Sequence, residues 1–450
     1  MSLKAIKVRF PPSPTGYCHV GTARMAVLNY MFAKKMGGTI VFRSEDTDRE
    51  RSTKEFEEDI VHELKWLGLE WDEFYRQSER TPTYTRELQR LIDEDKAYLS
   101  KEPSKKDPSI EVEVVRLRNP GKSITFTDII RGDITFDTTE LGDFAIARAV
   151  DDPLYHLTVV IDDALMGITH VIRGEDHISN TPRQILIQEA LGYSRPEYAH
   201  FPLHLAADKS KLSKRKGDVA VRSYREKGFL PEALLNYLAM LGWTPPSGRE
   251  IMNIDEMIAE FDLHDLHKSA AVFDLEKLRW FNRQYVERMN EDEFAQYALP
   301  VFKSALEEKG NSYDERLAGK LLSLLRERID VASDIKEAVA EGEFDFFFIK
   351  PTLDPARIPD KKSEAGAALK HLSFARDALT EISDSAWTAE GIKDALWEYA
   401  TAEGRGAVLW PLRYALSGRD KSPDPFLIAS IIGRESTLAR IDDARTVLAA

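Results

Sequence analysis

A strand, a rigid turn and a helix follow one another near the N-terminus, and this order constrains the fold more than any other feature. Apolar side chains alternate at Ile6, Val8 and Phe10, which predicts a strand. The next residues, Pro11–Gly21, include three prolines and two glycines, and a helical pattern then runs from about 23 to 36. A strand that enters a helix through a tight turn is typical of α/β proteins.

The same order repeats at once. Thr39–Phe42 is apolar and β-branched, which predicts a second strand that ends in the acidic turn Glu45–Asp48. Ser52, followed by Glu55 three residues later, predicts a capping box at the start of another helix. Four apolar residues lie on one face of that helix: Phe56, Ile60, Leu64 and Leu67. The repeat indicates a parallel sheet, and ligands bind such sheets at the carboxyl ends of the strands.

From about residue 95 to 152 the pattern changes to that of a small α+β insertion. A charged, proline-bearing stretch at Lys101–Pro108 predicts a loop, and three short alternating runs predict strands: Glu111–Leu117, Ile124–Phe126 and Ile134–Phe136. The α/β pattern then returns, with expected strands at Leu157–Ile161 and Thr169–Ile172 and a helix at Thr181–Leu191. After Lys216 the chain is mostly helical, with Pro351–Lys362 as the expected late linker.

Composition limits the class of protein. A chain of 450 residues is too long for a single core, so we expect about two to four domains. A single cysteine, Cys18, excludes an internal disulfide and a zinc site built from cysteines of one chain, and we expect no metal site and no zinc. Without a run of about 20 apolar residues or a secretory leader, we expect a cytoplasmic protein with no membrane span. The net charge of −14 lowers the expectation of a nucleic-acid partner, but local basic segments keep it open.

The proline-rich turn ends at His19 and Gly21, close to the start of the predicted helix. Free amides and the helix dipole at such a terminus favour a polyphosphate. His19 can donate a hydrogen bond to charge that develops on the phosphate, and Gly21 allows the nucleotide to approach the backbone. The alternative is a purely structural turn in which the histidine caps the helix.

A second basic segment, Lys209–Gly217, contains Lys211 and Lys214 on either side of Ser213. Two lysines three residues apart can hold a triphosphate and neutralise the charge of its transition state. The alternative is a solvated basic loop without a ligand.

Together these segments resemble the two signatures of class I aminoacyl-tRNA synthetases. The first is His19-Val-Gly-Thr22 and the second is Lys211-Leu-Ser-Lys-Arg215, with Thr22 and Arg215 departing from the general pattern as is common in the glutamate branch. Further segments resemble bacterial-type, zinc-free glutamyl-tRNA synthetases. They are Pro12–Gly16, Arg43–Asp48, Lys65–Leu69, Tyr155–Leu157, Asp162-Asp163, Gly167–Glu175 and Gly228–Ala233, and more weakly Pro411–Gly418.

The resemblance implies a site for glutamate and one for ATP. Arg9 and Arg173 would pair with the two carboxylates of glutamate, since guanidinium groups bind carboxylates in a fork that lysine cannot copy. Glu45 would hold the α-ammonium group, and Tyr155 and Ser13 would complete the polar lining. The ATP site would consist of Ser13, His19, Gly21, Lys211, Ser213 and Lys214, with His19, Lys211 and Lys214 as the catalytic groups.

The resemblance also implies the reaction and its partners. Glutamate would be activated by ATP, with Mg²⁺, to glutamyl-adenylate and transferred to tRNA(Glu), with tRNA(Gln) as an open second acceptor. We expect a monomer. Two alternatives remain: a shortened paralogue that modifies queuosine in tRNA, and a non-catalytic tRNA-binding paralogue.

The implied fold is a Rossmann-like parallel-sheet catalytic domain with an α+β insertion, followed by an all-α C-terminal half. Arg413 and Arg419, near Trp410 and Tyr414, are the candidates for tRNA contact, because arginine beside aromatic rings suits unstacked bases. The expected domains are 1–94 and 153–217 (the two halves of the catalytic domain), 95–152 (acceptor-stem insertion), 218–290 (helical stem-contact domain), and 291–365 and 366–450 (two anticodon-binding subdomains).

Overall fold

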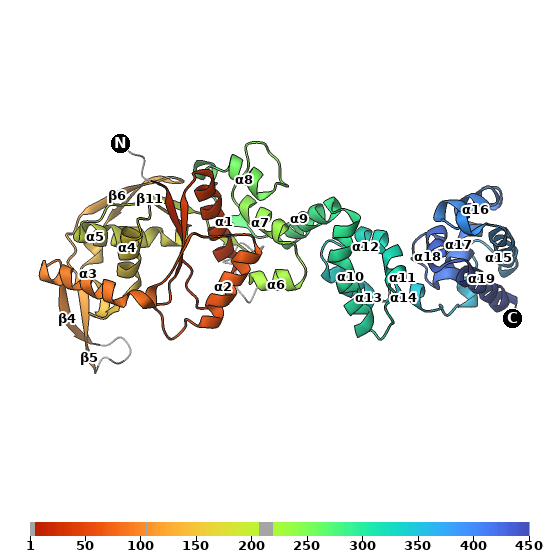
Figure 1. The fold of residues 1–450 in the computed structure, drawn as a ribbon, viewed down its shortest axis with the longest axis horizontal. Coiled ribbons are helices and arrows are strands. Elements are labelled where there is room, and N and C mark those ends of the chain that lie inside the picture. The colour runs from red at the N-terminus through yellow and green to blue at the C-terminus, as the bar shows by residue number, and fades with distance from the viewer. Residues whose placement is uncertain (1–4, 104–106, 108, 207–218, 450) are drawn as a thin grey trace. The chain divides into compact units, whose positions relative to one another are not determined.

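The computed structural model describes residues 5–103, 107, 109–206 and 219–449. The chain forms two compact units, Met1–Tyr285 and Val286–Ala450 (Figure 1). The finer division into six domains stays a prediction.

The first unit contains the parallel sheet that the sequence predicts. Strand β1 (Lys7–Phe10) pairs in parallel with β2 (Thr39–Ser44), which pairs in parallel with β3 (Glu73–Arg76). On the other side of β1 lies β10 (His170–Gly174), where the Thr169 N–H donates to the Lys7 carbonyl at 2.9 Å. Strand β10 pairs in parallel with β11 (Glu197–Phe201). Strands from both sides of the insertion therefore meet next to β1.

The insertion contributes strands to two sheets. Four strands form an antiparallel sheet of their own: β4 (Ala97–Pro103), β5 (Glu111–Leu117), β8 (Phe144–Ala149) and β9 (Asp152–Pro153). A hairpin of β6 (Ser123–Asp128) and β7 (Gly132–Asp137) joins β11 and extends the sheet that contains β10. The predicted α+β insertion is confirmed, but the predicted loop from Lys101 is wrong at its start. Strand β4 runs on to Pro103, which lies opposite Glu111.

Helices cover the sheets of this unit. Helix α1 (Val20–Lys35) packs on β1, β2 and β10, and its buried side chains include Ala23, Val27 and Met31. The other helices are α2 (Lys54–Trp66), α3 (Thr81–Asp93), α4 (Tyr155–Leu165), α5 (Thr181–Leu191), α6 (Val221–Glu226), α7 (Pro231–Met240), α8 (Ile254–Glu260) and α9 (Leu275–Arg288). Short 3₁₀ helices span η1 (Gln77–Arg80), η2 (Thr139–Leu141), η3 (Glu175–Asn180) and η5 (Leu263–Asp265), and strands β12 (His204–Leu205) and β13 (Ala271–Val272) pair in parallel.

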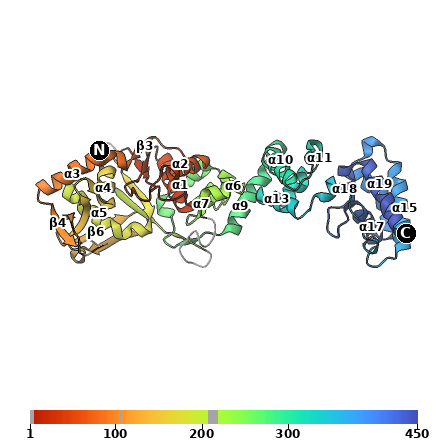
Figure 2. The same cartoon turned by 90° about the horizontal axis from the view of Figure 1, so that it is seen from below.

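In the described residues the second unit consists of helices and loops, which confirms the all-α C-terminal half. Helices α15, α17 and α19 pack on one another (Figure 2), and α16 packs on α18. Buried apolar side chains such as Leu372, Leu412 and Ile441 fill the space between them. The bounds are α10 (Glu291–Glu308), α11 (Glu315–Lys320), α12 (Leu322–Arg328), α13 (Ser333–Ala340), α14 (Asp345–Phe348), η6 (Pro355–Arg357), α15 (Ala365–Thr380), η7 (Asp384–Ala386), α16 (Ala389–Glu403), α17 (Arg405–Ser417), α18 (Pro425–Ile432) and α19 (Arg434–Ala449). No helix among the described residues is both long enough and apolar enough to cross a membrane.

The predicted strand Leu157–Ile161 is wrong, because these residues lie in helix α4. All residues from 157 to 163 are buried, so the segment lacks the polar face that marks an ordinary surface helix. A short apolar run of this kind fits a buried strand and a buried helix equally well, and periodicity cannot separate them.

The predicted capping box at Ser52 and Glu55 is also wrong. Thr53 caps α2, and its hydroxyl accepts from the Phe56 N–H at 3.2 Å. Glu55 instead accepts from the Tyr17 hydroxyl at 2.7 Å. The helix begins one residue later than the motif indicates, which moves the cap to the next hydroxyl residue.

The two hydroxyl residues are predicted to differ in their effect on α2. Thr53→Ala removes the cap and should lower the free energy of opening of the helix by about 1 kcal/mol. Ser52→Ala should cost less, because the Ser52 Oγ is buried without a hydrogen-bond partner in the described structure. Hydrogen exchange of peptides covering α2, followed by mass spectrometry, measures both. Equal loss of protection in the two variants would show that Thr53 is not the cap.

Candidate active site

The candidate site lies where β1, β2, β10 and α4 come together. Arg9 stands on β1 with only 2% of its surface exposed, and its Nε–H donates to Oδ1 of Asp163 at 3.3 Å. Arg173 stands on β10, 5% exposed. Two cationic side chains from neighbouring strands are thus held inside the protein, where each needs an anionic or carbonyl partner.

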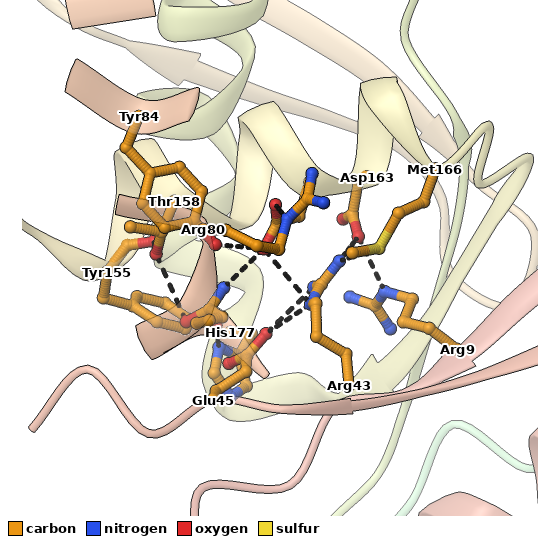
Figure 3. Close-up of polar contacts among 12 residues, drawn as sticks. Arg9, Arg43, Glu45, Arg80, Tyr84, Tyr155, Thr158, Asp163, Met166 and His177 are labelled. Atoms are coloured by element: carbon orange, nitrogen blue, oxygen red, sulfur yellow. Dashed lines mark hydrogen bonds and ion pairs between the residues drawn. The ribbon is translucent and has the colours of Figure 1, made fainter. Parts of the chain in front are cut away.

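Arg43 lies at the centre of this site and has no exposed surface (Figure 3). Its Nη1–H donates to Asp163 at 2.7 Å, and its Nη2–H and Nε–H donate to Oε1 of Glu45 at 2.9 and 3.3 Å. Burial alone would lower the pKa of the Arg43 guanidinium, but Asp163, Glu45 and Asp162 together raise it above its usual value. Arg43 therefore stays charged and neutralises the carboxylates around it.

Asp162, the neighbour of Asp163 in α4, lies 3.9 Å from Nε of Arg43 and has further partners of its own. Gln77 and Tyr84 donate to its Oδ2 at 3.0 and 2.7 Å, and Arg80 donates to its Oδ1 at 2.7 Å. Burial is the main reason that the pKa of the Tyr84 hydroxyl is raised, and the charge of Asp162 adds to it. These contacts fasten α4 to η1 and α3.

Arg173 is braced by two polar groups. Its Nε–H donates to Nε2 of His200 at 3.1 Å and its Nη2–H donates to the Thr181 hydroxyl at 2.9 Å. His200 is itself held by Asp128, 2.6 Å from its Nδ1. Because His200 accepts from Arg173, its proton lies on Nδ1, toward Asp128. The guanidinium is fixed in orientation without a carboxylate of its own.

Arg9 and Arg173 each have one nitrogen without a partner in the described structure. The Nη1 atoms of Arg9 and Arg173 are buried and make no hydrogen bond there. Buried donors are nearly always paired, so both nitrogens are open to an acceptor from outside the chain, a ligand or a water molecule. Burial lowers the pKa of Arg173, and the charge of Arg9 lowers it further, which places the two groups in one electrostatic environment.

Tyr155 and Glu45 line the same region. Burial, together with the charge of Glu45, raises the pKa of Tyr155 to about 12, so its hydroxyl stays protonated. Burial raises the pKa of Glu45 more than Arg43 and Arg9 lower it. The structure thus brings Arg9, Glu45, Tyr155 and Arg173 together as the sequence predicts.

His177, on η3, belongs to this group but was missed by the sequence analysis. Its Nδ1 lies 3.3 Å from the Tyr155 hydroxyl and 3.2 Å from Nδ2 of Asn180. Burial and then the charge of Arg173 lower its pKa to about 4, so the ring is neutral near pH 7. Its position four residues after Arg173, directly beyond the Gly-Glu-Asp turn, is the signal that could have found it.

His19 caps helix α1. Its Nδ1 accepts from the Gly21 N–H at 3.0 Å, so the ring proton lies on Nε2 and can be donated away from the helix. This is the structural role considered as an alternative. A Cβ at Gly21 would lie 2.9 Å from Cε1 of His204, so a larger residue would need the His204 ring to shift. Ser13 lies exposed on the preceding loop.

The backbone next to His19 is bonded to the segment that follows the lysine motif. The Val20 N–H donates to the Val219 carbonyl, and the Val221 N–H donates to the Cys18 carbonyl, both at 2.8 Å. Lys211, Ser213 and Lys214 lie outside the described residues. Among the described residues, no cluster of histidine, cysteine, aspartate or glutamate is arranged to hold a metal ion.

Both predicted tRNA-contact arginines make contacts inside the C-terminal unit. Arg413 stacks over Trp410 at 4.7 Å and donates to the Asp420 carbonyl at 2.9 Å. Arg419 donates to the Glu341 carbonyl at 3.1 Å. Tyr414, near both arginines in the sequence, is buried, with 2% of its surface exposed.

Comparison with known proteins agrees with this geometry. The family described as "tRNA synthetases class I (E and Q), catalytic domain" matches residues 5–107 and 100–280, and "Anticodon binding domain" matches 293–445. The chain is 40% identical to the glutamate–tRNA ligase of Aquifex aeolicus, covering 98% of both chains. It is 38% identical to that of Sulfurihydrogenibium sp., covering 97% of this chain and 98% of the relative.

Solved structures give the same result. A glutamate tRNA ligase from Elizabethkingia meningosepticum, solved in complex with its amino acid, superposes with a TM-score of 0.87 at 34% identity, covering 99% of this chain and 100% of that one. The match extends over the whole length of these relatives, so a shortened paralogue is not favoured. The chain belongs to the glutamate–tRNA ligase family of class I aminoacyl-tRNA synthetases.

Proposed function

We propose that L-glutamate binds between Arg9, Glu45, Tyr155 and Arg173, is activated there by ATP, and is then transferred to tRNA(Glu). The observation that carries the proposal is the pair of buried guanidinium groups, each with one unpaired N–H in the described structure. Two carboxylates on one small molecule would satisfy both.

The charge of the site supports an anionic amino acid. Arg43 is shared between Glu45 and Asp163, and Arg9 bonds Asp163, whereas Arg173 bonds only uncharged groups in the described structure. Glutamate carries two carboxylates and one ammonium group, so it can supply the anionic partner that Arg173 lacks.

The same charge would reject glutamine. Glutamine is neutral, and it would leave one buried guanidinium without an anionic partner. Glu45 would accept the α-ammonium group, and the protonated Tyr155 hydroxyl would donate to the bound amino acid.

Activation would proceed by attack of the α-carboxylate of glutamate on the α-phosphate of ATP, with pyrophosphate as leaving group. His19 would donate its Nε2–H to the phosphates, while Lys211 and Lys214 neutralise the charge that develops there. Ser13, Gly21 and Ser213 complete the proposed ATP site, and Mg²⁺ arrives with ATP as part of the nucleotide substrate. The backbone bonds of Val219 and Val221 beside His19 support this pairing of the two motifs.

The terminal ribose hydroxyl of the tRNA would then attack the adenylate. No protein nucleophile is needed, so the protein contributes positioning and electrostatic stabilisation. The match to an anticodon-binding family supports tRNA contacts in the C-terminal unit, where Arg413 and Arg419 are our candidates. Use of tRNA(Gln), the monomeric state and the cytoplasmic location stay predictions.

Arg173→Lys should lower kcat/KM for glutamate by about 100-fold or more, because lysine cannot brace on Thr181 and His200 and also bind a carboxylate. The KM for ATP should change little. Arg183→Lys, a matched arginine on α5 whose Nη1–H donates to the Ser179 carbonyl, should behave like the wild type. Steady-state aminoacylation at varied glutamate tests this. An unchanged KM for glutamate in Arg173→Lys would contradict the proposed site.

Lys214→Ala should lower the rate of adenylate formation by about 10²–10³-fold, the range seen when an electrostatic stabiliser is removed. Glutamate affinity should be unchanged, because this lysine acts on the phosphates. Lys209→Ala, in the same basic segment, is the control. Single-turnover adenylate formation separates the two steps, and a near-normal rate in Lys214→Ala would show that the segment is a solvated loop.

Arg413→Ala should lower kcat/KM for tRNA by about tenfold, the scale of one lost stacking contact to a base. Glutamate and ATP kinetics should not change. Arg405→Ala is a matched control, since Arg405 also stacks on a tryptophan, Trp397, at 4.4 Å. Charging of wild-type and anticodon-mutant tRNA by each variant provides the readout. If Arg413→Ala discriminates between the two tRNAs as well as the wild type does, Arg413 does not read the anticodon.

A further inference from the structure

Arg43 holds two groups of the glutamate site at once, because it bonds both Glu45 and Asp163. It donates to Glu45 with two N–H groups and to Asp163 with a third. Its fourth contact, 3.8 Å from its Nη1, is the sulfur of Met166. Its Nε also lies 3.9 Å from Oδ2 of Asp162, and its side chain is completely buried.

Asp163 links Arg43 to Arg9. Its Oδ1 atom accepts from Arg43 at 2.7 Å and from Arg9 at 3.3 Å, so one carboxylate oxygen joins the two arginines. Arg43 therefore fixes Glu45 directly and Arg9 through Asp163. These are the groups proposed above for the ammonium and for a carboxylate of glutamate.

We propose that Arg43 is a positioning residue that keeps Glu45 ionised for the substrate ammonium and keeps Arg9 aimed at the substrate carboxylate. This inference rests on the proposed glutamate site. It assigns Arg43 an electrostatic role beyond packing, because two buried carboxylates 2.7–2.9 Å from one guanidinium depend on its charge to stay unprotonated.

The charges around Glu45 determine in which direction the removal of Arg43 shifts the pKa of Glu45. Burial raises its pKa most, Arg43 and Arg9 lower it, and Asp163 raises it as a like charge. Tyr155, on α4, also faces it and is protonated. The ammonium group needs the ionised form, so glutamate affinity is lost as the pH falls through the pKa of Glu45. Removing Arg43 raises that pKa and moves the loss to higher pH, whereas removing the charge of Asp163 lowers it.

The test is the pH dependence of glutamate binding to the full-length enzyme, measured by calorimetry. Arg43→Gln should weaken glutamate binding by about tenfold or more at neutral pH. It should also move the acid limb of the binding profile, the pH range in which affinity is lost on acidification, up by about one pH unit or more. Arg43→Lys keeps the charge but cannot reach both carboxylates, so it should bind weakly with the acid limb near that of the wild type. Arg80→Gln is the matched control. Arg80 belongs to the same network, but its carboxylate partner is Asp162, so the pH at which this variant loses glutamate affinity should not change.

Asp163→Asn covers the case in which Arg43→Gln does not fold. It should move the acid limb to lower pH, opposite to Arg43→Gln, which a general loss of packing would not do. An acid limb that stays at the wild-type position in Arg43→Gln, or moves up in Asp163→Asn, overturns the inference. Glu45→Gln tests the proposed glutamate site independently of Arg43. Wild-type glutamate affinity in Glu45→Gln refutes the ammonium site. Weak binding in Arg43→Gln with an acid limb at the wild-type pH refutes only the role of Arg43.

Discussion

Burial of charge is the constraint on which the rest of the catalytic unit depends. An ion removed from water is tolerated only when partners replace its hydration, and losing one partner of a buried pair typically costs about 3–5 kcal/mol. Asp162 and Asp163 lie in the buried helix α4, and their partners come from β1, β2, η1 and α3. Electrostatic pairing therefore fixes α4 relative to the sheet and places Tyr155, at the N-terminal end of α4, beside Arg173.

The residues that line the site and the residues that hold them in place differ in how well the sequence predicts them. Arg9, Glu45, Tyr155 and Arg173 stand in segments that resemble a known family, and the structure brings them together. Arg43 and Asp163 are 120 residues apart, and nothing in the spacing shows that they are bonded. A usable signal existed, since two adjacent acids in an otherwise apolar run must find cations when the run is buried.

The sequence predicts secondary structure best where its residues are compatible with only one type of element. The prolines and glycines around Pro11–Gly21 leave little besides a turn, and the alternation before it suits a strand. Leu157–Ile161 was predicted as a strand because five apolar or β-branched residues in a row suit either element. The tertiary contacts of α4, above all those of its two aspartates, decide for the helix, and these contacts join residues far apart in the sequence.

The hairpin of β6 and β7 has a consequence for how such proteins diverge. The insertion leaves the catalytic sheet after α3 and returns before α4, and part of it, the β6–β7 hairpin, pairs with β11 through Tyr198 and Asp128. Asp128 also binds His200, which braces Arg173. An insertion or deletion that shifts Asp128 would therefore disturb Arg173 from within the inserted segment, whereas a change in length that leaves Asp128 in place would spare it.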